Sequence, residues 1–220
     1  IPLNATLPAV PAERVPEVLA KYEGEIQELK IKVAEKGQSL ADDIARVAAA
    51  RDALPSARLK VDANMGYTLA GALEALRKLC EYGIIYAEQP VASIEDMAAL
   101  RFAIAKEGLP ARIAADESIR KAEDPLKVAR ANAADLMVIK AAPLGGVRRA
   151  LALVEQAQLP AVVSSALESS VGIATGASLA ASLPTLRYGC GLGTVSLMAE
   201  DVTDEPLIAR DGVMDLRAIV

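Results

Sequence analysis

The chain has 220 residues, of which 53% are hydrophobic and 24% charged, a composition typical of a folded globular protein rather than a disordered one. Its formal net charge of −5 excludes the general basic surface with which proteins bind nucleic-acid backbones. It contains no histidine, which excludes histidine-ligated zinc, Ser-His-Asp triads and an imidazole base. Proton transfer must therefore use Lys, Asp, Glu, Tyr or one of the two cysteines.

The sequence shows no signal for a membrane or for export. No apolar run approaches the ~18 residues of a membrane span, and the first residues lack the charged and apolar regions of a signal peptide. Cys80 and Cys190 lie far apart and belong to no C-x-x-C pair, which favours free thiols in a reducing compartment. We expect a cytoplasmic protein that binds neither nucleic acid nor membrane.

Short apolar runs alternate with longer Ala/Leu-rich helical periods along the chain. In chain order, strands are predicted at 1–10, 28–33, 58–63, 84–87, 112–115, 136–139, 161–164 and 186–190. Helices are predicted at 12–22, 40–54, 68–82, after Ser93, from Asp124, at 146–157 and at 169–182. The sequence therefore predicts eight strands joined by seven helices.

The residues at the predicted helix starts support this order. Ser39 is a plausible N-cap, followed by acidic residues where the helix dipole favours them. Thr68 precedes the next helix, and Ser93 with Asp96 three residues later resembles a capping box. Asp124 is followed by a proline, which is a strong helix-start signal.

Several predicted strands are apolar on both faces, such as 136–139, which indicates a parallel sheet covered by helices. Eight such strands predict a closed, TIM-like (β/α)7β barrel over residues 1–198, with an irregular tail over 199–220 packed on it in place of the last helix. An open doubly wound sheet is the alternative. It has less support, because no G-x-G-x-x-G follows the first strand and no P-loop is present.

Charged residues recur where the predicted strands end, in steps of 24 to 30 residues that each match one strand-helix unit. A single one could be a solvated loop charge or helix cap. Charges at five strand ends in phase predict that all reach the same barrel mouth, where such folds place their sites. The residues are Lys30 and Lys32, then Asp62, Glu88, Asp116 and Lys140.

Three carboxylates at one barrel mouth would repel each other unless a cation lay among them. Oxygen donors without histidine or cysteine favour a hard ion, so we expect Mg²⁺, with Mn²⁺ as the substitute. The flanking lysines would then serve as acid and base groups, since a nearby dication and partial burial both lower a lysine pKa.

The segments around these charges resemble the enolase superfamily, specifically its muconate-cycloisomerase-like branch. They are a K-x-K strand at Leu29–Val33, Val61–Asn64, Ala87–Pro90, Ala115–Ser118 and Val138–Lys140. Within that branch, Pro2–Thr6, Ser164–Ser170 and Cys190–Thr194 are similar to the actinobacterial dehydratases of the menaquinone pathway. The resemblance extends from the first strand to the tail.

The resemblance implies a role for each residue of the predicted site. Lys30 would support Lys32, Asn64 and Glu117 would contact the metal ligands or the substrate, and Ser164 and Gly191 would lie near the substrate; a strand-end serine such as Ser164 is also a common helix cap. The metal ligands would be Asp62, Glu88 and Asp116, and the lysines flanking the substrate Lys32 and Lys140.

The implied reaction is the Mg²⁺-dependent syn-dehydration of a small carboxylate substrate, 2-succinyl-6-hydroxy-2,4-cyclohexadiene-1-carboxylate, to o-succinylbenzoate through an enediolate. Lys32 would remove the α-proton and return it to the departing hydroxyl, while Lys140 would stay cationic opposite. Three alternatives remain open: racemisation of N-acylamino acids, muconate-type cycloisomerisation, and a catalytically silent truncated or engineered barrel.

The same resemblance excludes some branches of the superfamily and bears on which domains this chain contains. Without histidine, the mandelate-racemase-like and acid-sugar dehydratase chemistries are excluded, and Gly191-Leu192-Gly193 lacks the Asp-x-Asp of dipeptide epimerases. Members of the superfamily carry an N-terminal capping domain over the barrel mouth. This chain begins at the first barrel strand without an initiator Met, so we expect the capping domain to be absent here, as a separate or deleted part.

Overall fold

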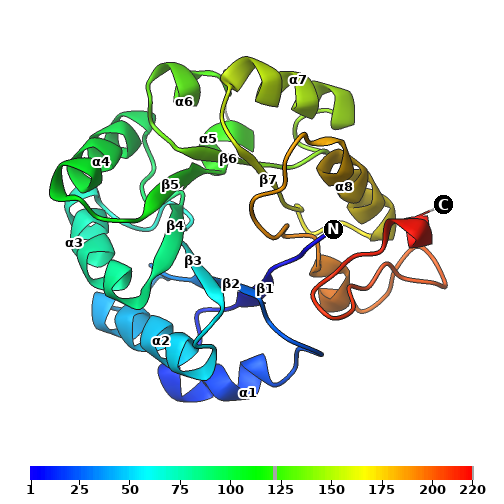
Figure 1. Ribbon diagram of the computed structural model, residues 1–220, viewed down its shortest axis with the longest axis horizontal. Helices are drawn as coiled ribbons and strands as arrows, with labels where there is room; N and C mark the ends of the chain where they lie inside the picture. Colours follow the sequence, from blue (N-terminus) through cyan, green and yellow to red (C-terminus); the bar gives the residue numbers. More distant parts are fainter. Residues whose placement is uncertain (121–122, 220) are drawn as a thin grey trace.

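The computed structural model describes residues 1–120 and 123–219. Seven strands form one sheet in the order β1 to β7, and each strand pairs in parallel with the next. The sheet curls around a central axis (Figure 1). The strands are β1 (Ala5–Leu7), β2 (Glu28–Lys32), β3 (Arg58–Asp62), β4 (Ile84–Glu88), β5 (Arg112–Ala115), β6 (Leu136–Ile139) and β7 (Ala161–Val163).

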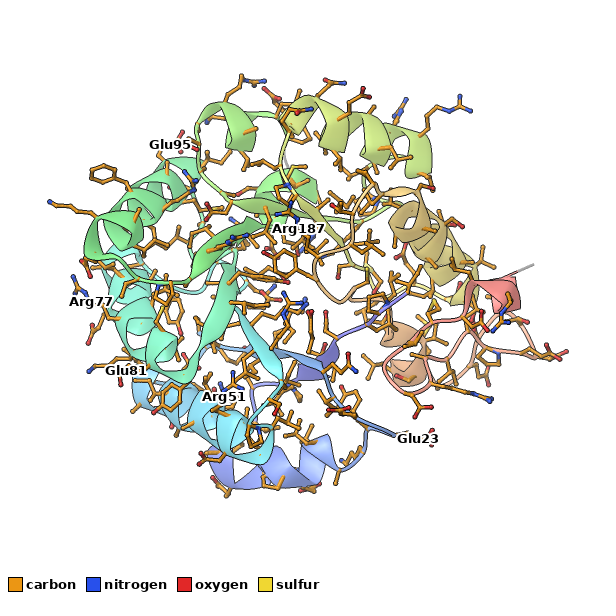
Figure 2. The ribbon with its side chains drawn as sticks, in the orientation of Figure 1. Glu23, Arg51, Arg77, Glu81, Glu95 and Arg187 are labelled. Atoms are coloured by element: carbon orange, nitrogen blue, oxygen red, sulfur yellow. The ribbon has the colours of Figure 1, made fainter. Side chains whose placement is uncertain are left out.

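Helices cover the outside of the sheet, so the predicted α/β barrel class is confirmed (Figure 1). Their exposed faces carry charged side chains such as Arg77, Glu81 and Glu95 (Figure 2). The helices are η1 (Ala12–Arg14), α1 (Val15–Leu19), α2 (Leu40–Ala53), α3 (Leu69–Leu79), η2 (Cys80–Tyr82), α4 (Ile94–Glu107), α5 (Glu117–Arg120), α6 (Lys127–Arg130), α7 (Val147–Ala157), α8 (Ser170–Ser182), η3 (Thr194–Leu197) and η4 (Leu216–Ile219). No helix of the described residues has the length and hydropathy needed to span a membrane.

The barrel closes between β7 and β1 without the regular eighth strand predicted at 186–190. Two isolated parallel bridges replace it, Leu3 with Cys190 and Ser164 with Gly191. The reason is local: a Cβ on Gly189 would lie 2.9 Å from the Leu3 carbonyl carbon, so the segment packs backbone against backbone. Glycine-rich segments have little strand propensity of their own, because they bring no side chains to pack on the sheet.

A buried ion pair holds this closing segment from inside the barrel. The Lys60 ammonium donates to the Gly189 carbonyl at 2.8 Å, and the Gly189 amide donates to Glu28 Oε2 at 2.8 Å. Lys60 and Glu28 also bond each other at 3.1 Å. Burial lowers the pKa of Lys60, and the Glu28 charge opposes that effect. The pair thus supplies hydrogen bonds that a strand ladder would otherwise provide.

The N-terminal elements are shorter than predicted. The strand expected over 1–10 is reduced to β1, because Pro2 and Pro8 on either side have no N–H to donate to a ladder. The helix expected over 12–22 divides into the 3₁₀ turn η1 and the five-residue helix α1. These differences leave the order of strands unchanged.

The predicted caps are mostly confirmed. Ser39 forms a complete capping box with Asp42, while Ser93 makes the N-cap bond without the reciprocal bond of a box. Thr68 caps α3 through the Gly71 amide. The helix predicted from Asp124 begins only at Lys127, because the Asp124 side chain accepts from the Leu126 amide and forms a turn there.

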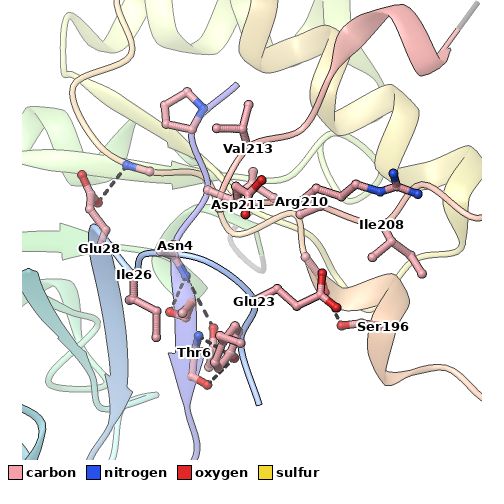
Figure 3. A pocket seen from close by; sticks show the side chains of 18 of the residues that line it. Asn4, Thr6, Glu23, Ile26, Glu28, Ser196, Ile208, Arg210, Asp211 and Val213 are labelled. Carbon is pink, nitrogen blue, oxygen red and sulfur yellow. Dashed lines mark hydrogen bonds between the residues drawn. The ribbon is translucent and has the colours of Figure 1, made fainter. Parts of the chain in front are cut away.

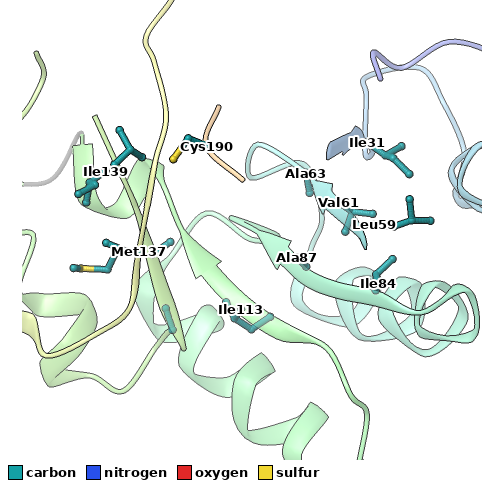
Figure 4. Close-up of a cluster of buried hydrophobic side chains, with 14 of the residues drawn as sticks. Ile31, Leu59, Val61, Ala63, Ile84, Ala87, Ile113, Met137, Ile139 and Cys190 are labelled. Carbon is teal, nitrogen blue, oxygen red and sulfur yellow. The ribbon is translucent and has the colours of Figure 1, made fainter. Parts of the chain in front are cut away.

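The two faces of the curled sheet bury different side chains, following the two-residue period of a strand. Outward residues such as Ile31, Leu59, Val61 and Ile113 pack beneath the helices (Figure 4). Inward apolar residues form a second cluster in the barrel: Tyr86, Ala114, Leu136, Val138, Val162 and Tyr188. The alternation leaves the charged residues of β2 and β3 inside the barrel.

The tail predicted over 199–220 contacts the chain's first residues and the start of α8. The Leu3 amide donates to the Gly212 carbonyl at 2.8 Å, and the Met214 amide donates to the Ile1 carbonyl at 2.9 Å. Asp201 accepts hydrogen bonds from both the amide and the hydroxyl of Ser170. The last position of the predicted range, 220, lies outside the described residues.

Candidate active site

Strand register places Lys32, Asp62 and Glu88 side by side. In the parallel ladders Lys32 is the direct partner of Asp62, and Asp62 is the direct partner of Glu88. Asp116 and Lys140 follow the last residues of β5 and β6. Because parallel strands all end at the same mouth of the barrel, the phase seen in the sequence becomes one continuous row of charges.

The row begins with two lysines that bind two carboxylates. Lys32 donates to Asp62 Oδ2 at 2.6 Å and to Asn64 Oδ1 at 2.7 Å. Lys30 lies two residues earlier on the same face of β2 and contacts Glu88 Oε1 at 3.2 Å and Asp62 Oδ2 at 3.5 Å. Lys30 therefore compensates the charges of both carboxylates from a position deeper in the barrel than Lys32.

The other half of the row centres on Asp116. Its two oxygens bind Lys140 at 2.7 Å and Arg120 at 3.1 Å. Arg120 also binds Glu117 Oε1 at 2.7 Å, and the side-chain amide of Asn64 donates to the same oxygen at 3.3 Å. Asn64 thus connects Lys32 at one end of the row to the Asp116 group at the other.

Burial makes these charges interact strongly. Burial and the neighbouring Asp62 charge raise the pKa of Glu88 to about 7, although Lys30 opposes them. Burial acts to raise the pKa of Asp62, but the charges of Lys30 and Lys32 outweigh it and the pKa lies below its usual value. For Lys30 burial is likewise outweighed, here by Glu88 and Asp62, so its pKa lies above its usual value.

The loop after β2 is held by a buried ion pair on α2. Arg46 is fully buried, donates to the Lys32 carbonyl at 2.9 Å and binds Asp43 at 2.9 Å. Asp43 in turn accepts from the Ala34 amide at 3.0 Å and from the Tyr67 hydroxyl at 2.7 Å. These contacts place the backbone of Lys32 relative to the loop that follows β3.

Ser164 and Gly191 meet each other at the junction that closes the barrel. Ser164 Oγ lies 3.5 Å from the Gly191 carbonyl, and a Cβ on Gly191 would lie 2.6 Å from that hydroxyl. Only glycine therefore fits at 191 without movement. Within the described part of the chain, neither residue bonds to the row of charges.

The donor chemistry of the row fits a hard divalent cation. Asp62, Glu88 and Asp116 offer carboxylate oxygens, and Glu117 Oε2 is buried without a hydrogen-bond partner among the described residues. The oxygens are turned toward ammonium and guanidinium groups in this structure. No three Asp, Glu, His or Cys side chains of residues 1–120 and 123–219 are arranged as a metal site. Metal binding by the three carboxylates therefore stays a prediction.

A cavity of about 1380 Å³ lies elsewhere. It lies along β1, between the segment before β2 and the tail, and is lined by residues such as Asn4, Glu23, Ile26 and Arg210 (Figure 3). None of the predicted site residues lines it. This cavity is therefore separate from the charged mouth.

Sequence reasoning gave no role to Arg120 or to the Asp43–Arg46 pair. The spacing of Arg120 from Asp116 and Glu117, four and three residues on, is that of side-chain pairs on one helix face and could have indicated it. The Asp43–Arg46 spacing carries the same signal. Lys60 and Glu28 had no such signal, because they meet only when neighbouring strands pair.

The fold and the row of strand-end charges agree with the family to which the chain belongs. The model of the enolase C-terminal domain-like family matches residues 12–218, which is nearly the whole chain. The chain is therefore a member of that family, as its motifs predicted.

Two curated relatives of the chain share one name. The chain is 55% identical over 221 residues to an o-succinylbenzoate synthase from Mycolicibacterium smegmatis and 48% identical over 220 residues to one from Thermobifida fusca. The matches cover 100% of this chain and 66% and 67% of those proteins. The chain thus spans about two thirds of the length of the curated relatives that it matches.

Solved structures confirm the branch. Muconate cycloisomerase from Pseudomonas fluorescens superposes with a TM-score of 0.81 at 29% identity, covering 96% of this chain and 59% of that one. A dipeptide epimerase from Enterococcus faecalis V583 superposes with a TM-score of 0.79 at 25% identity, covering 94% and 60%. The barrel is therefore of the muconate-cycloisomerase-like kind.

Proposed function

We propose that this chain is the barrel of a Mg²⁺-dependent dehydratase that forms o-succinylbenzoate from 2-succinyl-6-hydroxy-2,4-cyclohexadiene-1-carboxylate, a step of menaquinone synthesis. The observation that carries the proposal is the order of charges at five consecutive strand ends. They are Lys32, Asp62, Glu88, Asp116 and Lys140. The relatives named o-succinylbenzoate synthase support this reaction over the others of the branch. The cytoplasm is the expected compartment, since Cys80 and Cys190 are free thiols.

Asp62, Glu88 and Asp116 would hold the cation, with Mn²⁺ able to replace Mg²⁺. When bound there, the cation supplies positive charge that stabilises the negative charge developing on the substrate carboxylate. Glu117 and Asn64 would keep these ligands in place, since both belong to the same hydrogen-bonded row.

Lys32 would act as both base and acid. Its side chain is 31% exposed, more than that of any other charged residue in the row, so it can reach a substrate in the mouth. In its neutral form it takes the proton on the carbon next to the carboxylate, and the C–H electrons form the enediolate. The same ammonium then gives that proton to the departing hydroxyl, the C–O bond breaks, and water leaves.

Lys140 would act only through its charge. Its side chain is 9% exposed and binds Asp116 at 2.7 Å, and three strands lie between β6, which Lys140 follows, and β2, which carries Lys32. From that position a fixed cation stabilises the enediolate on the face opposite Lys32. Lys30 would support Lys32, and Ser164 and Gly191 would lie beside the substrate.

Racemisation of N-acylamino acids is the second candidate. It is favoured by the presence of a lysine at both ends of the row, because a racemase needs one base on each face of the enolate. The geometry that supports the dehydratase, a more exposed Lys32 and a buried Lys140, gives the two lysines unequal access instead.

The test is a Mg²⁺-dependent dehydration assay, run on this chain alone and with the remaining third of a relative added. We expect turnover that needs Mg²⁺, and calorimetric titration in which Asp116→Asn severely weakens Mg²⁺ binding. Asp135→Asn is the matched control, because Asp135 binds the Ile113 amide at the opposite end of β5. Equal affinity in the parent and Asp116→Asn would remove the metal assignment, and cation binding without turnover of either substrate would favour the silent barrel.

A further inference from the structure

Gln89 is a fully buried amide between the ends of β4 and β5. It follows Glu88 directly, and both the oxygen and the nitrogen of its side-chain amide form hydrogen bonds. Its Oε1 accepts from the backbone amides of Asp116 at 3.0 Å and Ser118 at 3.1 Å. Its Nε2 donates to the Val91 carbonyl at 3.0 Å and to the Ser118 hydroxyl at 2.8 Å. The side chain therefore joins the loop after β4 to the loop after β5.

The backbone of Gln89 extends the connection to a third loop. Its amide donates to the Ala114 carbonyl at 2.8 Å, and its carbonyl accepts from the Met65 amide at 2.7 Å in the loop after β3. Its φ is 37°, in the left-handed region that residues other than glycine seldom adopt. Such a conformation persists when the surroundings hold it, and at Gln89 hydrogen bonds from three successive loops do so.

Gln89 matters more for the position of Asp116 than for the positions of Asp62 and Glu88. Asp62 and Glu88 are register partners within the β3–β4 ladder. Asp116 lies one residue past the end of β5, where the ladder with β4 has already ended at Ala114. Where a strand neighbour would accept the Asp116 N–H, the side-chain oxygen of Gln89 accepts it instead.

We propose that Gln89 is a positioning residue that sets the spacing between the carboxylates of Glu88 and Asp116, and thereby the affinity of the mouth for a divalent cation. The inference rests on the metal site of the proposed function. It adds a residue that does not bind the cation itself but positions the carboxylates that do. Groups that hold metal ligands from behind commonly change metal affinity by about 10- to 100-fold when they are replaced.

The experiment is a Mn²⁺ titration followed by electron paramagnetic resonance, on the parent chain and three variants. Gln89→Met conserves volume but removes the acceptor of the Asp116 amide, and Gln89→Asn is one methylene too short to reach it. We expect both to weaken Mn²⁺ binding by about tenfold or more. Gln89→Glu keeps an acceptor of the same length, so we expect an affinity at or above that of the parent.

Asp135→Leu is the matched control for stability. Asp135 accepts the Ile113 amide at 2.8 Å at the start of β5, as Gln89 accepts the Asp116 amide just past its end. We expect this control to lower the urea midpoint while its Mn²⁺ affinity equals that of the parent. An equal affinity loss in the control would show a general effect of weakened folding and would overturn the inference.

The remaining outcomes separate the inference from the function beneath it. If the parent binds Mn²⁺ and the folded Met and Asn variants bind it equally well, the inference is wrong and the metal site stands. If the parent does not bind Mn²⁺, the metal site is wrong and the inference fails with it. If circular dichroism shows that Gln89→Met does not fold, the contrast between Gln89→Asn and Gln89→Glu decides.

Discussion

Lys32 is the last residue of β2, Lys140 directly follows β6, and each binds an aspartate, yet their surroundings differ. Lys32 is about one third exposed and shares its ammonium between Asp62 and Asn64. Lys140 is buried against Asp116, which Arg120 also binds. A base must reach substrate and change protonation, whereas a fixed cation must only remain charged. This difference is the reason that we propose proton transfer by Lys32 and electrostatic stabilisation by Lys140.

Arginine substitutions separate these two roles. Lys32→Arg keeps the charge, but a guanidinium with a pKa above ~12 is useless as a base. We expect dehydration to fall by about 10³-fold, within the range that general bases contribute. Lys140→Arg keeps what its role requires, so we expect a loss of less than about 10²-fold.

The measurement is steady-state dehydration together with α-proton exchange in D₂O, using a stable substrate analogue. A dehydratase should lose exchange in Lys32→Arg and keep part of it in Lys140→Arg. Equal and complete loss in both variants would contradict this assignment and favour racemisation by two bases.

At the scale of elements, the closure of the barrel rests on residues 189–191 rather than on a regular strand. The Glu28–Lys60 pair binds both backbone groups of Gly189, and Leu3 pairs with the next residue along. The close approach depends on glycine at 189, because any side chain there meets backbone atoms that cannot rotate away. The element is thus defined by contacts from the segment before β1 and from β2 and β3.

A pair of alanine substitutions tests this account. A Cβ at 189 would lie 2.9 Å from the Leu3 carbonyl carbon and 3.0 Å from the Asn4 amide nitrogen, whereas a Cβ at 193 meets nothing within 4 Å. We expect Gly189→Ala to lower the free energy of unfolding by about 1–3 kcal/mol through overpacking. Gly193→Ala should change it by less than about 0.5 kcal/mol. Urea unfolding measures both, and equal effects would contradict the close-packing argument.

At the scale of the whole molecule, the tail and the charged mouth are separate parts of one barrel. The tail bonds to the first residues of the chain and to Ser170 at the start of α8. The predicted site residues lie between 30 and 191, outside the tail. The tail should therefore contribute to stability without contributing a ligand.

Deletion of residues 199–220 tests that separation. It removes the acceptors of the Leu3 and Ser170 amides and exposes the surface covered by buried Met214. We expect a lower melting temperature, with about 1 kcal/mol lost for each hydrogen bond, and a Mn²⁺ affinity equal to that of the full chain. Differential scanning calorimetry and metal titration are the measurements; weaker Mn²⁺ binding would show that the tail supports the mouth.

The sequence by itself determined the parallel barrel and the row of charges. Each strand-helix unit has a similar length, and parallel strands end at one mouth, so regular spacing of Asp62, Glu88 and Asp116 along the chain is enough to place them together. Helix starts at Ser39, Thr68 and Ser93 were equally visible, because a cap bonds to residues only three positions away.

Tertiary structure alone decided which charges pair and what holds them. Lys30 binds Glu88 across 58 residues of sequence, Lys60 binds the Gly189 carbonyl across 129, and Gln89 accepts the amide of Asp116 across 27. No local pattern encodes such contacts, because they arise when the sheet curls and brings inward side chains of different strands together. For the same reason the missing eighth strand was not predictable: its place is filled by a glycine that fits only against the backbone of Leu3.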